Sequence, residues 1–247
     1  MLQLKGVSKR FGGVVAVDGV DLEVAAGAVH ALIGPNGAGK TTLIGQISGT
    51  LPSDRGSIVF DGADITHAKP HDRVKAGLAR SYQITSIFRR FSVLDNLALA
   101  VQARSGSSFS FWQPVEKETV LFDEARAIAA QVGLSQKLDF LASSLAHGEQ
   151  RALEVGLALA TRAKLVLLDE PMAGMGPEDS QRMIALISRM RAQVTVLLVE
   201  HDMDAVFRLA DRISVMVNGR LIATGSPEKI KMNAEVRKAY LGDELAA

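Results

Sequence analysis

The stretch Gly34-Pro35-Asn36-Gly37-Ala38-Gly39-Lys40-Thr41 (residues 34–41, GPNGAGKT) decides the fold. It fits the pattern G-x-x-x-x-G-K-[ST] and stands between the apolar run 28–33 and a helix expected over 41–49. In this setting glycines let backbone N–H groups close around phosphate oxygens, and the helix N-terminus adds a positive dipole. We expect Lys40 to reach the β- and γ-phosphates of a nucleotide, Thr41 to bind Mg²⁺, and Thr42 to donate to the α-phosphate.

Two adjacent carboxylates follow a second apolar run. Residues 165–168 (LVLL) lead directly into Asp169-Glu170-Pro171. The carboxyl ends of buried strands are where α/β folds place their chemistry. We expect Asp169 to hold Mg²⁺, directly or through its water shell, and Glu170 to polarise the water that attacks the terminal phosphate.

The remaining patterns predict an α/β fold. Apolar residues alternate with polar ones near residues 2–4 and 20–24, which indicates half-exposed antiparallel strands. Strand, helix and strand alternate from 165 to 199, which predicts parallel pairing. Asp61-Gly62 and Asn218-Gly219 follow apolar runs and predict tight turns. The predicted class is a phosphate-loop NTPase core with a mixed sheet and antiparallel N-terminal strands.

A helical segment interrupts this core. Residues 94–103 and 116–132 have helical spacing, and the polar stretch 104–114 between them predicts a loop. The predicted organisation is one domain over residues 1–247, with an ATPase core of 1–83 and 161–247 and an inserted helical subdomain of 84–160.

A third motif, LAHGEQR (residues 145–151), opens an apolar-periodic helix that runs to residue 160. Together with the glycine loop, LLDEP (167–171) and VEHD (199–202), it has the order and spacing of the ATP-binding domain of ABC transporters. The chain resembles that domain over essentially its whole length. Most phosphate-loop families share the glycine loop and the acidic strand end, whereas the LAHGEQR segment between them is typical of ABC proteins.

The resemblance implies a nucleotide held between two ATPase subunits. In that family the signature helix of one subunit faces the γ-phosphate bound by the other. Carried over, Gly148, Glu149 and Gln150 would close the site of the second subunit. A monomer would therefore be catalytically incomplete.

Three further positions match family motifs. Gln83 takes the place of the Q-loop residue, which senses Mg²⁺ and the membrane partner. His201 takes that of the switch histidine, which contacts the γ-phosphate and orients water. Phe11 takes that of the aromatic residue that stacks on adenine.

The expected site therefore comprises three sets of residues, with ATP and Mg²⁺ as cofactors. The catalytic set is Lys40, Gln83, Glu170 and His201. The metal-binding set is Thr41, Gln83 and Asp169. The nucleotide-binding set is Phe11, Val17, Gly34, Pro35, Asn36, Gly37, Ala38, Gly39, Lys40, Thr41, Thr42, Ala146, Gly148 and Glu149.

Finer matches indicate a branch of the family. Residues 9–24, 170–180, 199–207 and 235–244 resemble the larger ATPase subunit of importers for branched-chain amino acids and related amides or urea. Such importers pair two different ATPases with two membrane subunits and a periplasmic binding protein. The resemblance implies a heterodimer, or a homodimer in isolation, peripheral to the cytoplasmic face of the inner membrane. We expect residues 88–97 to dock a helix of the membrane subunit.

Two departures from the family pattern stand out. Ala146 replaces the usual signature serine, so one hydroxyl donor to the γ-phosphate is missing. Residues 173–176 (AGMG) replace the usual Ser-Ala-Leu-Asp of the D-loop. We expect hydrolysis to survive both changes, and the D-loop change puts communication between the two sites in doubt.

Composition excludes several other classes. The net charge of +1 gives no overall field toward nucleic acid, and the absence of cysteine excludes disulfides and thiolate metal sites. No apolar run approaches the roughly 18–20 residues needed to span a bilayer, and residues 1–10 lack the apolar region of a signal peptide. We expect the chain to stay on the cytoplasmic side.

Three alternatives remain at this point. Residues 86–97 (SIFRRFSVLDNL) also resemble the ATPase of a lipopolysaccharide-type ABC exporter. A non-transport ABC protein of DNA repair or translation usually needs two ATPase domains or a long coiled coil. A small-molecule kinase would need an acceptor-binding lid and has no use for LAHGEQR.

Overall fold

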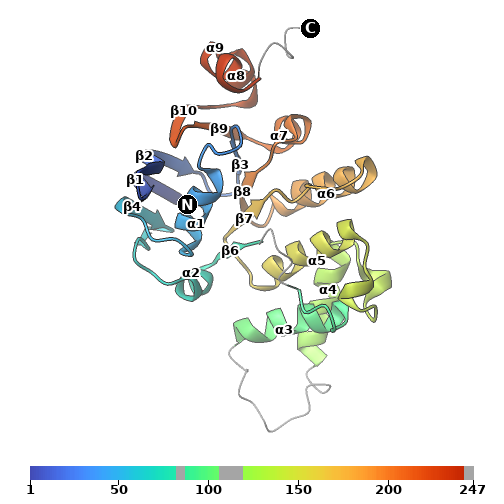
Figure 1. Ribbon diagram of the computed structural model, residues 1–247. Helices are drawn as coiled ribbons and strands as arrows, with labels where there is room; N and C mark the ends of the chain where they lie inside the picture. The colour runs from blue at the N-terminus through green and yellow to red at the C-terminus, as the bar shows by residue number, and fades with distance from the viewer. Residues whose placement is uncertain (82–86, 106–118, 242–247) are drawn as a thin grey trace.

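Two sheets and the helices that pack against them make up the chain in the computed structural model, which describes residues 1–81, 87–105 and 119–241 (Figure 1). The larger sheet has the strand order β10-β9-β3-β8-β7-β6. Its neighbouring strands pair in parallel, except that β9 and β10 form an antiparallel hairpin. Its strands are β3 (Val29–Ile33), β6 (Leu78–Arg80), β7 (Leu165–Asp169), β8 (Thr195–Val199), β9 (Arg212–Val217) and β10 (Arg220–Gly225).

The central strands of this sheet are covered on both faces. Every residue of β3, β7 and β8 is buried, as expected where helices pack on both sides of a parallel sheet. In β3, Leu32 joins the core around α1 (Lys40–Ser48), whereas Ala31 and Ile33 join the core around α7 (Met203–Leu209). Because parallel strands end at the same edge of a sheet, the loops after β3, β7 and β8 meet there.

The second sheet is antiparallel, which confirms the prediction from the alternating N-terminal residues. Its order is β2-β1-β4-β5, with β1 (Leu2–Phe11), β2 (Val14–Val24), β4 (Arg55–Phe60) and β5 (Ala63–Asp64). Leu2, Leu4 and Leu22 pack in one core cluster with α1 and with β7 of the larger sheet. Helix α1 therefore lies between the two sheets.

Both predicted tight turns are confirmed. Asp61 and Gly62 have φ values of 49° and 83°, and Asn218 and Gly219 have 47° and 81°. Consecutive positive φ values give the turn twist that suits two-residue hairpins, and Asn-Gly and Asp-Gly adopt them at little cost.

Between β6 and β7 the described chain is helical, as predicted. It contains α3 (Val93–Ser105), α4 (Thr119–Gln131) and α5 (His147–Ala160), with the 3₁₀ turns η2 (Ser135–Lys137) and η3 (Ala142–Ser144). One apolar core joins these helices to β7, β8 and α6 (Pro177–Met190). Each fully buried Leu or Ile in it contributes about 1.5–3 kcal/mol of transfer free energy, so the helical part is anchored on the sheet.

Some boundaries differ from the prediction. Helix α3 continues to Ser105, so residues 104 and 105 are helical rather than part of a loop; residues 106–118, including the expected helix start at 116, lie outside the described residues. The patterns did not indicate β6 or α2 (Pro70–Ala76). The division of the chain at residues 84 and 160 stays a prediction.

The chain closes with short elements at the edge near β10 (Figure 1). These are α8 (Pro227–Met232), α9 (Ala234–Val236) and the π-helical turn η4 (Arg237–Leu241). Across the described ranges, no helix combines the length and the apolar character that crossing a bilayer requires.

Candidate nucleotide site

A pocket of about 440 Å³ opens where β3 ends and α1 begins. This volume falls in the range of small-ligand sites, roughly 300–1,000 Å³. It combines the glycine loop with a carboxylate that follows β7 and with two hairpin segments. The lining residues are Val14, Val15, Ala16, Asn36, Gly37, Ala38, Gly39, Lys40, Thr41, Thr42, Glu170, Asn218 and Gly219.

The ammonium group of Lys40 is folded over the glycine loop. Its Nζ donates to the carbonyl oxygens of Gly34, at 2.7 Å, and Pro35, at 3.0 Å. Burial lowers the pKa of Lys40, against the charges of Glu170 and Asp169, which raise it. A phosphate placed beside this ammonium would supply the opposite charge that favours its protonated form.

Gly39 makes the tight entry into α1 possible. Its φ of 103° lies in the left-handed region, and a Cβ at this position would collide with the carbonyl oxygen of Ala16. Helix α1 begins at the next residue, so the free N–H groups of its first turn face the pocket that the loop lines.

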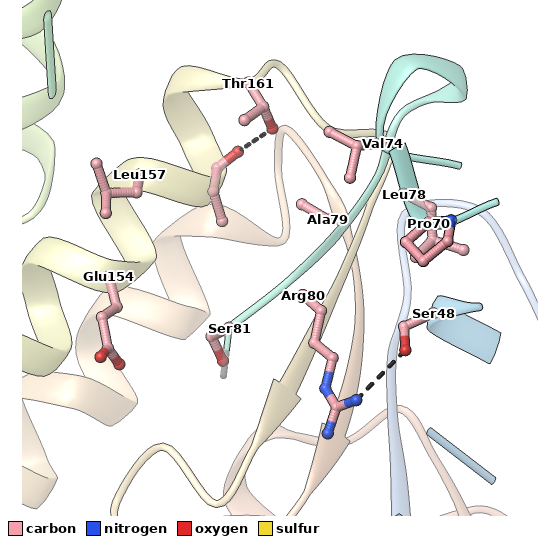
Figure 2. A pocket seen from close by; sticks show the side chains of 11 residues that line it. Ser48, Pro70, Val74, Leu78, Ala79, Arg80, Ser81, Glu154, Leu157 and Thr161 are labelled. Atoms are coloured by element: carbon pink, nitrogen blue, oxygen red, sulfur yellow. Dashed lines mark hydrogen bonds between the residues drawn. The ribbon is translucent and has the colours of Figure 1, made fainter. Parts of the chain in front are cut away.

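Asp169 ends β7 and is buried, outside the pocket lining. Its Oδ2 accepts from Arg80 Nη2 at 3.0 Å, and Arg80 Nη1 also donates to Ser48 Oγ at 3.3 Å (Figure 2). The sequence patterns did not single out Arg80, because the ion pair joins residues far apart in the sequence. The guanidinium neutralises the carboxylate expected to bind Mg²⁺.

The expected metal ligands fit an ion that binds together with a nucleotide. Among the described residues, no group of three or more His, Asp or Glu side chains could hold an ion. Mg²⁺ usually takes one or two protein ligands together with phosphate oxygens and water. The exposed hydroxyl of Thr41 and the carboxylate of Asp169 match that pattern. Gln83, the third expected ligand, lies outside the described residues.

Glu170 and His201 meet beside the pocket. His201 Nε2 lies 3.3 Å from Glu170 Oε2, and their side chains are 46% and 20% exposed. Glu170 has a φ of 52°, and its N–H donates to the carbonyl oxygen of Val199 at 2.9 Å. The loops after β7 and β8 therefore bring together two residues that are separated in the sequence.

Sequence patterns missed Glu200, although it neighbours His201. Glu200 is buried, and its carboxylate accepts from the backbone N–H groups of Met172 and His201. No periodic or motif signal marks a carboxylate as buried. A clue was its position directly after a buried strand.

Neither Phe11 nor Val17, both expected at the nucleotide, is among the residues that line the pocket. Phe11 is 48% exposed and pairs across the hairpin with Val14, which lines the pocket. Lys9 Nζ lies 5.6 Å from the centre of the Phe11 ring. Val17 is fully buried in the core, and residues 14–16 line the pocket.

Residues 146–149, at the start of the signature helix α5, lie away from this pocket. Ala146 and His147 are exposed at the start of α5, and none of residues 146–149 lines the pocket. Glu149 Oε2 accepts from the Ala146 N–H at 3.1 Å, and the Glu149 carboxylate pairs with Lys137 at 2.7 Å. Ala146 has no side-chain oxygen to cap the first turn of α5, whose N–H groups have no intrahelical acceptors.

Comparison with known proteins decides the family. The family model described as "ABC transporter" matches residues 17–173, and the one described as "Branched-chain amino acid ATP-binding cassette transporter" matches residues 220–246. The chain belongs to the ABC transporter family. This ABC protein is an ATPase subunit of the transport type, as the order and spacing of its four motifs indicated.

Relatives of this ABC ATPase match it over nearly their whole length. The high-affinity branched-chain amino acid transport ATP-binding protein BraF of Pseudomonas aeruginosa is 36% identical, and its counterpart LivG of Escherichia coli is 34% identical, each over 98% of both chains. Two solved ATP-binding cassettes of ABC transporters, one nucleotide-free and one in an ADP conformation, are 31% and 32% identical. Both have a TM-score of 0.85 and are matched over 98% of this chain and 99% and 98% of theirs.

Proposed function

We propose that this chain binds MgATP and hydrolyses it to power an importer of branched-chain or other hydrophobic amino acids. The observation that carries the hydrolytic role is the 3.3 Å approach of His201 to Glu170 at the pocket of the glycine loop. BraF and LivG are named for branched-chain amino acid transport, and residues 220–246 match a branched-chain family model. These matches support this substrate class and favour import over lipopolysaccharide export.

In the proposed reaction, the terminal phosphate lies over the glycine loop. Lys40 leaves its carbonyl partners and stabilises the charge on the phosphate oxygens. Glu170 directs water in line at the γ-phosphorus, and His201 orients that water and contacts the phosphate. Thr41 and Asp169, with Gln83 by resemblance, would hold Mg²⁺, which neutralises phosphate charge when bound.

A second ATPase subunit completes the site in this proposal. Residues 146–149 are remote from the pocket lining of their own chain, and the first turn of α5 is exposed. Ala146, Gly148 and Glu149 would therefore face the nucleotide of the second subunit, and backbone N–H groups would serve in place of the missing serine hydroxyl.

The membrane subunits dock, in our proposal, at the exposed part of residues 88–97 and at a cleft beside β6. A cleft of about 160 Å³ lies between α5 and the α2–β6 segment, lined by apolar side chains such as Val74, Leu78 and Leu157 (Figure 2). Phe88 and Phe91 are 57% and 44% exposed, with stacked rings 5.5 Å apart. Exposed aromatic side chains of this kind suit the apolar face of an amphipathic helix.

The buried residues correct part of the docking prediction for 88–97. Val93 and Leu97 are fully buried in the core, so they cannot touch a partner. Docking at the membrane subunits would place the chain at the cytoplasmic face of the inner membrane, with a periplasmic binding protein on the other side.

Glu170→Gln tests the hydrolytic role. The amide cannot accept a proton from water, so we expect ATP binding to persist while turnover falls about 10²–10³-fold. Glu23→Gln, which changes an exposed carboxylate on β2, is the matched control and should hydrolyse normally. Normal turnover by the Glu170→Gln variant would remove Glu170 as the base.

A cysteine cross-link tests the docking surface. The chain has no cysteine, so Phe88→Cys introduces a unique thiol. We expect it to cross-link to a membrane subunit in the assembled transporter, whereas Met232→Cys, 81% exposed on α8, should not. Equal yields from both positions would contradict docking at Phe88.

A further inference from the structure

Glu200 is a buried carboxylate to which the proposed reaction gives no role. It follows β8 directly and is 2% exposed. Its Oε1 accepts from the Met172 N–H at 2.8 Å, its Oε2 accepts from the His201 N–H at 3.1 Å, and the Asp202 N–H is a further donor. Glu200 is absent from the pocket lining, so it does not touch the nucleotide there.

These contacts join the two loops that carry the reacting side chains. Met172 lies two residues after Glu170, and His201 and Asp202 follow β8. Because the two carboxylate oxygens take N–H groups from different loops, Glu200 fixes one loop relative to the other. The distance between His201 Nε2 and Glu170 Oε2 depends on that relative position.

The turn at Glu170 needs such an anchor. Glu170 has a φ of 52°, a left-handed conformation that costs a non-glycine residue on the order of 1–3 kcal/mol. It persists when the surroundings fix it, here through the bonds from Glu170 N–H to Val199 and from Ala173 N–H to the Glu170 carbonyl. Met172 lies within this turn, between Glu170 and Ala173, and the hydrogen bond from its N–H to the Glu200 carboxylate ties the turn to the end of β8.

We propose that Glu200 is a positioning residue that holds Glu170 and His201 in register for ATP hydrolysis. The proposal rests on the proposed function, since it concerns the same reaction. Glu200 acts through the backbone and takes no proton from water.

Glu200→Gln tests the positioning role of the carboxylate without changing the size of the side chain. Glutamine has the same length, but its amide group keeps a single acceptor oxygen. Met172 and His201 use different carboxylate oxygens, so one of their N–H groups must lose its acceptor. A displacement of about 1 Å at reacting groups can cost roughly 10²-fold in rate. We expect kcat to fall about 10–100-fold, with ATP affinity changed less than about threefold because the glycine loop is untouched.

Thr195→Val is the matched control. Thr195 begins the same strand that Glu200 follows, is 2% exposed, and its Oγ1 accepts from the Gly27 N–H at 2.9 Å. Valine has the same shape and removes this backbone anchor at the far end of β8. We expect a lowered melting temperature with an unchanged kcat.

A spectroscopic measurement adds a readout that does not need turnover. The imidazole resonance of His201 is assigned by its loss in His201→Gln. We expect Glu200→Gln to shift this resonance and Thr195→Val to leave it in place.

Several outcomes would overturn the positioning role. They are a normal kcat in Glu200→Gln, an equal fall of kcat in Thr195→Val, a loss of ATP affinity as large as the loss of kcat, or an unmoved His201 resonance. If the wild-type protein in its assembled transporter hydrolyses no ATP, the proposed function fails, and the resonance still decides whether Glu200 sets the position of His201.

Discussion

Acidification tests the burial of His30 in β3, the strand that leads into the glycine loop. His30 is fully buried, and its Nε2 lies 2.8 Å from Ser214 Oγ. Among the described residues, its Nδ1 has no hydrogen-bond partner. Burial, and next the charge of Arg212, lowers the pKa of His30 from 6.5 to about 4. Folding therefore keeps this ring neutral.

The sign follows from which state binds more protons. Between about pH 6.5 and 4, the unfolded chain carries a proton on His30 that the folded chain excludes. The stability associated with neutral His30 is complete above about pH 6.5 and is lost as the pH falls toward 4. At about 1.4 kcal/mol per pKa unit, the loss is about 2 kcal/mol at roughly pH 5 and about 3 kcal/mol near pH 4.

Urea unfolding at a series of pH values measures this loss in the wild type and in His30→Met, which removes the titrating ring and keeps apolar bulk. Burial also raises the pKa of Glu154 and Glu200, which stabilises the folded state as pH falls. That contribution is common to both proteins, so the difference between their free energies of unfolding isolates His30. Parallel curves between about pH 7.5 and 5 would refute the burial argument.

Two further substitutions test the site. Gly39→Ala should abolish ATP binding, measured by titration calorimetry, because its Cβ would collide with the carbonyl oxygen of Ala16; binding at wild-type strength would contradict the geometry of the loop. Arg80→Met leaves Asp169 as a buried, unpaired carboxylate, and we expect it to lower the free energy of unfolding by about 3 kcal/mol or more. Arg220→Met, which breaks an exposed ion pair, should cost less than about 1 kcal/mol in the same denaturant assay, and equal losses would contradict the argument.

Local signals predicted much of this fold because local physics determines them. The Asp61-Gly62 and Asn218-Gly219 turns adopt the positive φ values that these dipeptides favour. The glycine loop, with an apolar strand before it and a helix after it, is a continuous segment, so its residues meet without help from the rest of the chain. Helix α6 lies between β7 and β8, as the alternation of strand, helix and strand from 165 to 199 predicted.

Features that depend on distant residues escaped prediction. Strand β6 has three residues, too few for a pattern to show. The β1–β2 ladder contains register shifts near Val7, Lys9 and Arg10. Each shift changes which face a side chain points to, and the sequence carries no mark of it. The Arg80–Asp169 pair likewise forms only when β6 lies beside β7.

The ends of β7 and β8 present three carboxylates whose surroundings differ. The carboxylate of Asp169 is buried against a guanidinium, and that of Glu200 is buried against backbone N–H groups. Glu170 alone among these three lines the pocket, with a side chain 20% exposed and an imidazole beside it. A base must reach water, and the burial of Asp169 and Glu200 keeps both away from it. The burial of the other two therefore leaves Glu170 as the carboxylate that can activate water, independently of any motif.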